Sequence, residues 1–242
     1  GISIRHVRLP TVPPRPRLLD ENLKPRLVPI ATQFRSAEGS LPMSVLDTAV
    51  RRDLARAALD LAAKGAWREV TLTKLAEAAG RPAPELYGAS PWEAIDCVEE
   101  AFDRAIADGP ALDPAQSVRD RLFDLVMRRF EAMEPHRAAV TAMEAGVDRD
   151  PILLASVHQR HVRCARWVLA LAGLEADGMS GQARAQGLGV IIGQARAAWR
   201  GDEAGDYAKT MASLDKNLRR AEEMFGRWAG FEAKPKQDGA SA

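Results

Sequence analysis

The sequence is poor in cysteine. It holds two, Cys97 and Cys164, far apart in a chain of 242 residues. A pair this widely spaced does not form the disulfide framework of small secreted proteins, and it is typical of reduced thiols in the cytosol. The chain also lacks the apolar run of about 18 residues that a membrane-spanning helix needs, and it shows no apolar core of signal-peptide type. These absences predict a cytoplasmic protein with no transmembrane segment.

Aromatic residues make up 5% of the sequence, and no run of alternating β-branched residues predicts a sheet. Residues that favour helix, chiefly Ala, Leu, Arg and Glu, dominate instead. Apolar residues recur at helical spacing along most of the chain. The sequence therefore predicts an all-α fold of about nine helices, with three small helices followed by five or six longer ones.

Motifs of catalysis are missing as well. The GLGVIIG run at 187–193 lies inside a helical pattern rather than after a strand, and no nucleophile elbow, zinc-protease motif or paired carboxylates occur. His158, His161 and Cys164 are spaced three apart, which makes a metal site conceivable, but no companion motif supplies a fourth ligand. We predict no enzymatic activity, no catalytic residues, no cofactor and no metal site.

Composition divides the chain into four parts. Residues 1–43 contain seven prolines and seven basic residues against three acidic ones, which predicts a flexible, basic extension. Its PPRPR segment at 13–17 suits contact with phosphates or docking of a partner. Residues 44–109 and 110–231 are the predicted N- and C-terminal helical domains, because Gly109-Pro110 is a strong helix stop. Residues 232–242 form a polar tail that we expect to be disordered.

A helix-turn-helix pattern occupies the N-terminal domain. Thr71 is placed to cap a helix over 72–79, and Gly80 to end it. Pro82 or Pro84 is placed to open a second helix, the one that enters the DNA major groove in such motifs. A capping box, Ser-Pro-Trp-Glu at 90–93, opens the next helix.

In the C-terminal domain, helical patterns follow Asp113, which we expect to cap its helix, and then span 135–145, 152–172 and 180–200, with a last helix from Asp206 to about residue 230. Four glycines at 181, 187, 189 and 193 interrupt one of these patterns. Since glycine weakens a helix interior by about 1 kcal/mol relative to alanine, their presence predicts close approach of another helix or of a ligand.

At this point the sequence resembles the TetR family of transcriptional regulators. The resemblance covers residues 45–108 and is carried by ALDLAAKGAW, by VTLTKLAEAAG, by Leu86-Tyr87, and by the Pro-Trp-Glu-Ala start of the following helix. It implies an all-α homodimer with an N-terminal DNA-binding domain. It also implies a C-terminal domain that binds a small apolar molecule and dimerises through its last two helices.

Candidate site residues follow from the resemblance together with charge and composition. Thr71 and Tyr87 match positions that often contact phosphate in the family, and the available cations complete the set. The candidate DNA-binding residues are Arg51, Arg68, Thr71, Lys74, Arg81 and Tyr87. Aromatic and methionine side chains of the C-terminal domain suit a cavity between helices. The candidate ligand-binding residues are Phe123, Met127, Phe130, Met143, Trp167 and Trp199.

A second resemblance leaves an alternative open. After Arg81 the predicted recognition helix carries no Arg, Lys, Asn or Gln, the side chains that usually read bases, and residues 44–109 hold eight basic against twelve acidic residues. The segments RDRLFDLVMRRFEAMEPHRAAV and AAWRGDEAGDYAKTMASLDKNLRRAEEMF are similar to ubiquinone-biosynthesis accessory proteins. That resemblance implies a TetR-like protein that has lost DNA binding and binds a lipid or isoprenoid.

The leading hypothesis is a homodimeric regulator that binds an operator and responds to a small apolar ligand, and the alternative is the lipid-binding accessory protein. A third hypothesis is a helical scaffold that docks partners through residues 1–42.

Overall fold

The computed structural model describes residues 46–145, 151–203 and 205–225, with side chains in the second range from residue 154 onward. Over these ranges the chain forms helices and no strand, so the all-α prediction is confirmed. The predicted N-terminal extension, the polar tail and the last helix beyond residue 225 lie outside the described residues.

Local capping builds the first helices, and the predicted cap at Thr71 is confirmed. Helix α1 (Thr48–Ala63) begins after Asp47, whose carboxylate accepts a hydrogen bond from the Val50 amide at 2.9 Å. A single 3₁₀ turn, η2 (Trp67–Glu69), leads to α2 (Leu72–Ala79), where the Thr71 hydroxyl accepts from the Lys74 amide at 3.3 Å. Gly80, at φ 64°, ends α2 in a left-handed conformation that favours glycine.

The second short helix predicted after Gly80 is present and begins after Pro82, as a single 3₁₀ turn. Residues Ala83–Leu86 form one 3₁₀ turn, η3, held by hydrogen bonds of Glu85 N to Pro82 O at 3.0 Å and of Tyr87 N to Pro84 O at 3.3 Å. Pro82 is the N-cap and Pro84 lies in the first turn, where a backbone N–H has no partner within the helix. Gly88, at φ 84°, turns the chain away directly after it.

Helix α3 (Pro91–Ala105) begins at the predicted cap, since the Ser90 hydroxyl accepts from the Glu93 amide at 3.2 Å. It continues into a 3₁₀ turn, η4 (Ile106–Asp108). The next cap was predicted at Asp113, and this is wrong: α4 (Val118–Met133) is capped by Ser117, while Asp113 accepts from Ala115 N at 2.8 Å in a turn.

The remaining elements are η5 (Glu134–His136), α5 (Arg137–Glu144), α6 (Pro151–Leu171), α7 (Gly178–Arg200) and α8 (Ala208–Phe225). The predicted cap of the last helix, Asp206, is also wrong. The Asp202 carboxylate instead accepts from the Lys209 and Thr210 amides, each at 2.8 Å. Tyr207, at φ 53°, bends the chain between Asp202 and these amides.

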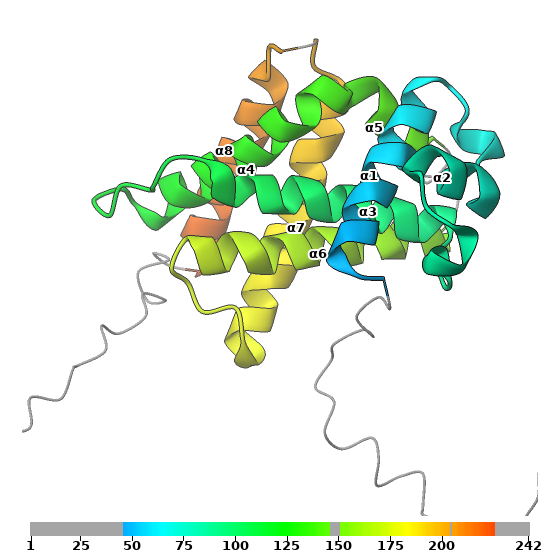
Figure 1. Cartoon of the computed structure of the whole chain (residues 1–242). Coiled ribbons are helices and arrows are strands. Elements are labelled where there is room, and N and C mark those ends of the chain that lie inside the picture. The colour runs from blue at the N-terminus through cyan, green and yellow to red at the C-terminus, as the bar shows by residue number, and fades with distance from the viewer. Residues whose placement is uncertain (1–45, 146–150, 204, 226–242) are drawn as a thin grey trace, which may run out of the picture. The chain divides into compact units, whose positions relative to one another are not determined.

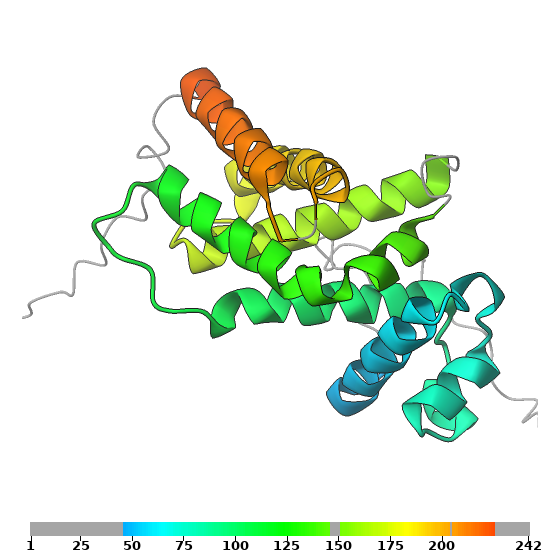
Figure 2. The same ribbon diagram turned by 90° about the horizontal axis from the view of Figure 1, so that it is seen from above.

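Packing joins these helices around one apolar core that runs from α1 to α8. Helix α1 packs on α2, α3 and α5, while α6 packs on α7 and α7 on α8. Figures 1 and 2 place α1 and α2 at one end of the described fold, away from α8. Helix α3 contacts α1 as well as α4 and α6, so it links the α1–α2 end to the longer helices. No helix in the described ranges is long and apolar enough to cross a membrane.

Candidate functional site

A buried ionic cluster lies where α3 meets α4, α5 and α7. The Glu99 carboxylate of α3 accepts hydrogen bonds from Arg129 of α4 and from Arg196 of α7, the latter at 2.8 and 3.1 Å. Arg129 also donates to Asp103 at 2.8 Å. Arg196 Nε forms an ion pair with Glu144 of α5 at 2.5 Å. The cluster therefore ties four helices together through charged groups that are almost fully removed from water.

The charges of this cluster stabilise one another. Burial alone would raise the pKa of Glu99, but attraction from Arg196 and Arg129 outweighs it and holds that pKa well below its usual range. Burial alone would lower the pKa of both arginines, and the attraction of Glu99 reverses this effect. All three groups stay ionised, so removal of one partner would leave an uncompensated charge in the interior.

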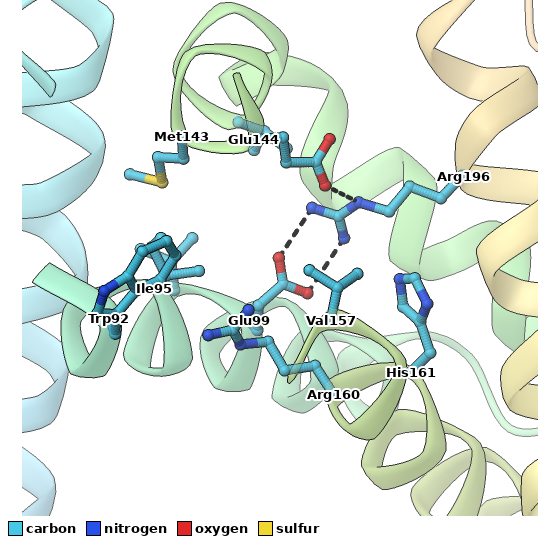
Figure 3. Close-up of a pocket in the computed structure, with 11 residues that line it drawn as sticks. Trp92, Ile95, Glu99, Met143, Glu144, Val157, Arg160, His161 and Arg196 are labelled. Carbon is cyan, nitrogen blue, oxygen red and sulfur yellow. Dashed lines mark hydrogen bonds and ion pairs between the residues drawn. The ribbon is translucent and has the colours of Figure 1, made fainter. Parts of the chain in front are cut away.

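A small cavity opens beside the cluster (Figure 3). Its volume is about 20 Å³, room for roughly one water molecule. Trp92, Ile95 and Glu99 of α3 line it together with Met143 of α5. Figure 3 shows the Arg196 guanidinium between Glu99 and Glu144 at one side of this space.

A larger cavity of about 380 Å³, here called the α6–α7 cavity, lies next to the small cavity. The two cavities share four lining residues: Glu144, Val157, His161 and Arg196. The volume of the α6–α7 cavity falls in the range of roughly 300–1,000 Å³ that small-molecule sites occupy. Much of the lining is apolar and comes from α6 and α7: Leu154, Val157, Gly189, Val190, Gly193 and Ala197.

Two glycines of α7 shape this region, as predicted from their number. A Cβ on Gly189 would lie 2.9 Å from Val162 Cγ2 and 3.1 Å from Val162 N, so glycine here permits close contact between the α7 and α6 backbones. A Cβ on Gly193 would lie 3.0 Å from the Nδ1 atom of His161. Close approach of another helix is therefore confirmed at Gly189, whereas a Cβ on Gly187 would meet nothing within 4 Å.

His161 stands in the wall of both cavities and is 7% exposed. Burial, together with the positive charges of Arg196 and Arg129, lowers its pKa to about 3, so the imidazole is neutral at physiological pH. In Figure 3 the ring lies apart from the dashed interactions that join Glu99, Glu144 and Arg196.

The predicted ligand residues are dispersed by the fold. Met143 lines the small cavity, and Phe123 lines a separate surface hollow beside Met211. Phe130 and Trp199 are fully buried with ring centroids 6.2 Å apart. Met127 is buried. Trp167 of α6 is partly exposed and donates a hydrogen bond to Asp103 O at 2.8 Å.

Three residues that line the small cavity were not predicted from the sequence to bind a ligand: Glu99, His161 and Arg196. Charged and imidazole side chains within apolar helical patterns read as ordinary surface positions, because their partners are distant in sequence. The glycines of α7 were the available signal, since Gly193 lies directly against His161.

The six predicted DNA-binding residues fall into two groups. Arg68, Thr71, Lys74 and Tyr87 are exposed, and Tyr87 is the most open of them at 82%. Lys74 also lies 3.7 Å from Glu69 in an exposed ion pair. Arg51 and Arg81 are less exposed and are paired within the protein at shorter distances. Arg51 lies 2.7 Å from Glu93 and 2.5 Å from Glu100, and Arg81 lies 2.5 Å from Asp53 and 3.2 Å from Glu85.

The histidines and cysteine of the spaced-by-three pattern do not converge. His158 Nε2 lies 2.9 Å from Gln186 Oε1, and the buried Cys164 thiol has its pKa raised well above the usual range, first of all by burial. Within the described ranges, no group of three or more His, Cys, Asp and Glu side chains is arranged to hold a metal ion.

Two solved structures share this fold. A TetR transcriptional regulator from Nitrosomonas europaea ATCC 19718 matches with a TM-score of 0.54 and 22% identity, over 72% of this chain and 98% of that one. A TetR transcriptional regulator from Rhodococcus sp. RHA1 matches with a TM-score of 0.52 and 19% identity, over 71% of this chain and 94% of that one. No known family and no curated protein matches the sequence itself. The predicted TetR-like fold is confirmed.

Proposed function

We propose that the protein is a ligand-responsive, DNA-binding regulator with a TetR-like fold that works as a homodimer. The observation that carries the proposal is the position of α3. This helix starts four residues after Tyr87, at the end of the helix-turn-helix region, and its Trp92, Ile95 and Glu99 side chains line the small cavity beside the ionic cluster. Helix α3 does not itself line the larger α6–α7 cavity, but its Glu99 accepts a hydrogen bond at 2.8 Å from Arg196, which does. Through this contact α3 would connect the surface that would face DNA to the space that would hold a ligand.

The mechanism follows from this connection. A ligand in the α6–α7 cavity would press on His161 and Arg196, and Arg196 is hydrogen-bonded to Glu99 of α3. A shift of α3 would carry η3 and α2 with it, and it would change the spacing of the two DNA-facing units in a dimer. Such a ligand regulates only if its affinity differs between the two spacings.

Arg68 and Lys74 are the cations best placed for DNA contact, because both are exposed. We expect binding to an operator fragment, selected from genomic DNA, to weaken with salt, and the double variant Arg68→Ala/Lys74→Ala to bind less tightly with a shallower salt slope. Lys216→Ala/Arg219→Ala removes the same charges from α8 and serves as the control. If no fragment is preferred over random DNA at any salt concentration, the regulator proposal fails.

The second candidate function is a TetR-like accessory protein that binds a lipid or isoprenoid without binding DNA. Two observations favour it. Arg51 and Arg81 are paired with carboxylates and so are poorly available to phosphates. The element in the recognition position is a single 3₁₀ turn containing Pro84 and Glu85.

Native mass spectrometry of the protein purified without detergent separates the two candidates. A co-purifying lipid together with absent DNA preference supports the accessory protein. Specific DNA binding by a protein free of lipid supports the regulator. Docking through residues 1–42 stays a prediction, because that segment lies outside the described residues.

A further inference from the structure

His161 is a buried imidazole whose hydrogen-bonding capacity is unused. It is 7% exposed, and among the described residues none hydrogen-bonds to either ring nitrogen. The ring nitrogens do not belong to the fully buried atoms that lack a partner, so they are accessible from the cavity that the ring lines. An accessible imidazole without a protein partner can hydrogen-bond to a ligand or to water. The neighbouring His158, in contrast, has its Nε2 atom 2.9 Å from Gln186 Oε1.

The surroundings of His161 keep space for a ligand. Gly193 faces the ring, and a Cβ at that position would crowd Nδ1 at 3.0 Å. The ring also belongs to the wall of the α6–α7 cavity, whose volume is about 380 Å³. Apolar side chains from α6 and α7, Leu154, Val157 and Val190, form the rest of the wall near it.

Charge decides which chemical class suits this cavity. Two arginines, Arg196 and Arg200, reach it, but both are paired with carboxylates: Arg196 with Glu99 and Glu144, and Arg200 with Glu144 at 3.5 Å. The wall is therefore electrically balanced and offers no spare cation for an anionic ligand. A neutral imidazole presents one donor and one acceptor, which a hydroxyl group can satisfy in either tautomer.

We infer that the α6–α7 cavity binds a neutral, apolar molecule that carries a hydroxyl or phenol group, and that this group hydrogen-bonds to His161. This inference rests on the proposed ligand-responsive function, for which it names the ligand class. His161 is the specificity-determining residue, and the apolar wall supplies the remaining affinity.

Three probes of one shape test the inference by calorimetric titration of the full chain: 1-naphthol, naphthalene and 1-naphthoate. We expect 1-naphthol to bind on the order of tenfold more tightly than naphthalene, the equivalent of one net hydrogen bond. His161→Phe should abolish this preference while leaving the affinity for naphthalene unchanged, which also shows that the cavity is intact. His158→Phe, in the same cavity wall, should preserve the preference.

Gly193→Ala provides an independent variant, because its added methyl group displaces the His161 ring. It should weaken 1-naphthol binding, whereas Gly187→Ala, the same change in α7 with open space around it, should not. Equal affinities for naphthol and naphthalene, a preference that survives His161→Phe, tighter binding of 1-naphthoate, or no binding of any probe would each overturn the inference. Because these titrations contain no DNA, their failure is distinct from a failure to bind an operator.

Discussion

At the scale of single residues, His161 makes the acid stability of the protein depend on one side chain. Its folded-state pKa is lowered from 6.5 to about 3, mainly by burial, while the unfolded chain keeps the ordinary value. At pH values between these two pKa values, the imidazole is protonated in the unfolded chain but neutral in the folded protein. Stability is therefore lost as the pH falls through this window, by about 1.4 kcal/mol per pH unit for one group.

His161→Phe is expected to remove this loss. The variant should unfold at higher urea concentration than the wild type at pH 5, because it has no imidazole to protonate in the unfolded state. The difference between the two proteins should shrink toward neutral pH, where the imidazole is neutral in the unfolded chain as well. Urea unfolding across this pH range, with His158→Phe as the control, measures the effect. Parallel pH profiles for wild type and His161→Phe would contradict it.

The groups that face His161 do not cancel this dependence. Glu99 from α3, Arg129 from α4 and Arg196 from α7 remain ionised, since the pKa of the carboxyl is held low and those of the arginines are raised. A carboxyl with a lowered pKa adds its own loss of stability only below its ordinary value of 4.5. Between pH 4.5 and the ordinary histidine pKa of 6.5, the change in stability therefore reports the protonation of His161 rather than that of Glu99.

Arg196 provides the second residue-scale prediction. Arg196→Met should destabilise the fold by about 3–5 kcal/mol, because Glu144 loses its buried partner and Glu99 loses one of two. The matched change in an exposed pair, Arg219→Met beside Asp215, should alter stability by less than about 1 kcal/mol. Urea unfolding of both variants at neutral pH gives the comparison. If both variants lose similarly little free energy of unfolding, the ion pairs of the cluster do not behave as buried ion pairs.

At the scale of elements, glycine placement in α7 sets how closely α6 can approach. Gly189→Ala gains about 1 kcal/mol of helix propensity, but its methyl group meets Val162 side chain and backbone, and such overpacking typically destabilises by about 1–3 kcal/mol. We expect a net loss of stability. Gly187→Ala, with nothing in its way, should be stabilising. Thermal unfolding at equal protein concentration tests the pair, and a Gly189→Ala protein as stable as Gly187→Ala would refute the close contact.

The starts of α2 and α3 were predictable because their caps are local. Asp47, Thr71 and Ser90 each bind an amide three residues ahead, so a short sequence window contains the whole interaction. The equally local cap of α4, Ser117, was missed because Asp113-Pro114 offers a competing start four residues earlier. The cap of α8 escaped prediction because Asp202 reaches amides seven and eight residues away across the bend at Tyr207. The length of the 83–86 helix was also not predictable, because Pro82 and Pro84 indicate where a helix starts but not how many turns follow.

The candidate site was less predictable than the helices around it. Glu99 and Arg196 are 97 positions apart, and nothing in either helical pattern indicates that they meet. Apolar periodicity identifies which face of a helix is buried, but not which charged residues of that face neutralise each other. Only the glycines of α7 indicated where the candidate site lies. They predict that another group comes close to this helix, but they do not identify that group.

At the scale of the whole molecule, the ionic cluster gives the fold a means of coupling its two ends. Helix α3 contacts α1 at the end that is proposed to face DNA, and its acidic side chains pair with Arg129 and Arg196 in the interior. Buried charged groups tolerate few alternative arrangements, since each displacement leaves a charge without its partner. A ligand that displaces Arg196 would therefore move α3 as a unit, in line with the regulation proposed above.

The proposed homodimer depends on the face of α7 that lies next to α8. A hollow of about 520 Å³ lies between α7 and α8, and its lining includes Ala183, Ile191 and Met224. Met224 is 66% exposed in the single chain. Because an exposed apolar patch of this kind marks an interaction surface, and because α7 and α8 pack side by side, a second copy related by a two-fold axis is the occupant we expect.

Met224→Glu should therefore shift the protein from dimer to monomer, because it places a carboxylate against its own symmetry mate in an apolar interface. Met211→Glu makes the same change on the same helix at a methionine that is 41% exposed, but it faces the separate hollow beside Phe123 and should leave the dimer intact. Sedimentation velocity over a concentration series reports the association of both variants and of the wild type. A dimer that survives Met224→Glu, or one that Met211→Glu disrupts equally, would place the contact elsewhere. If Met224→Glu yields a folded monomer, its operator affinity should fall as well, since a palindromic site then binds each half separately.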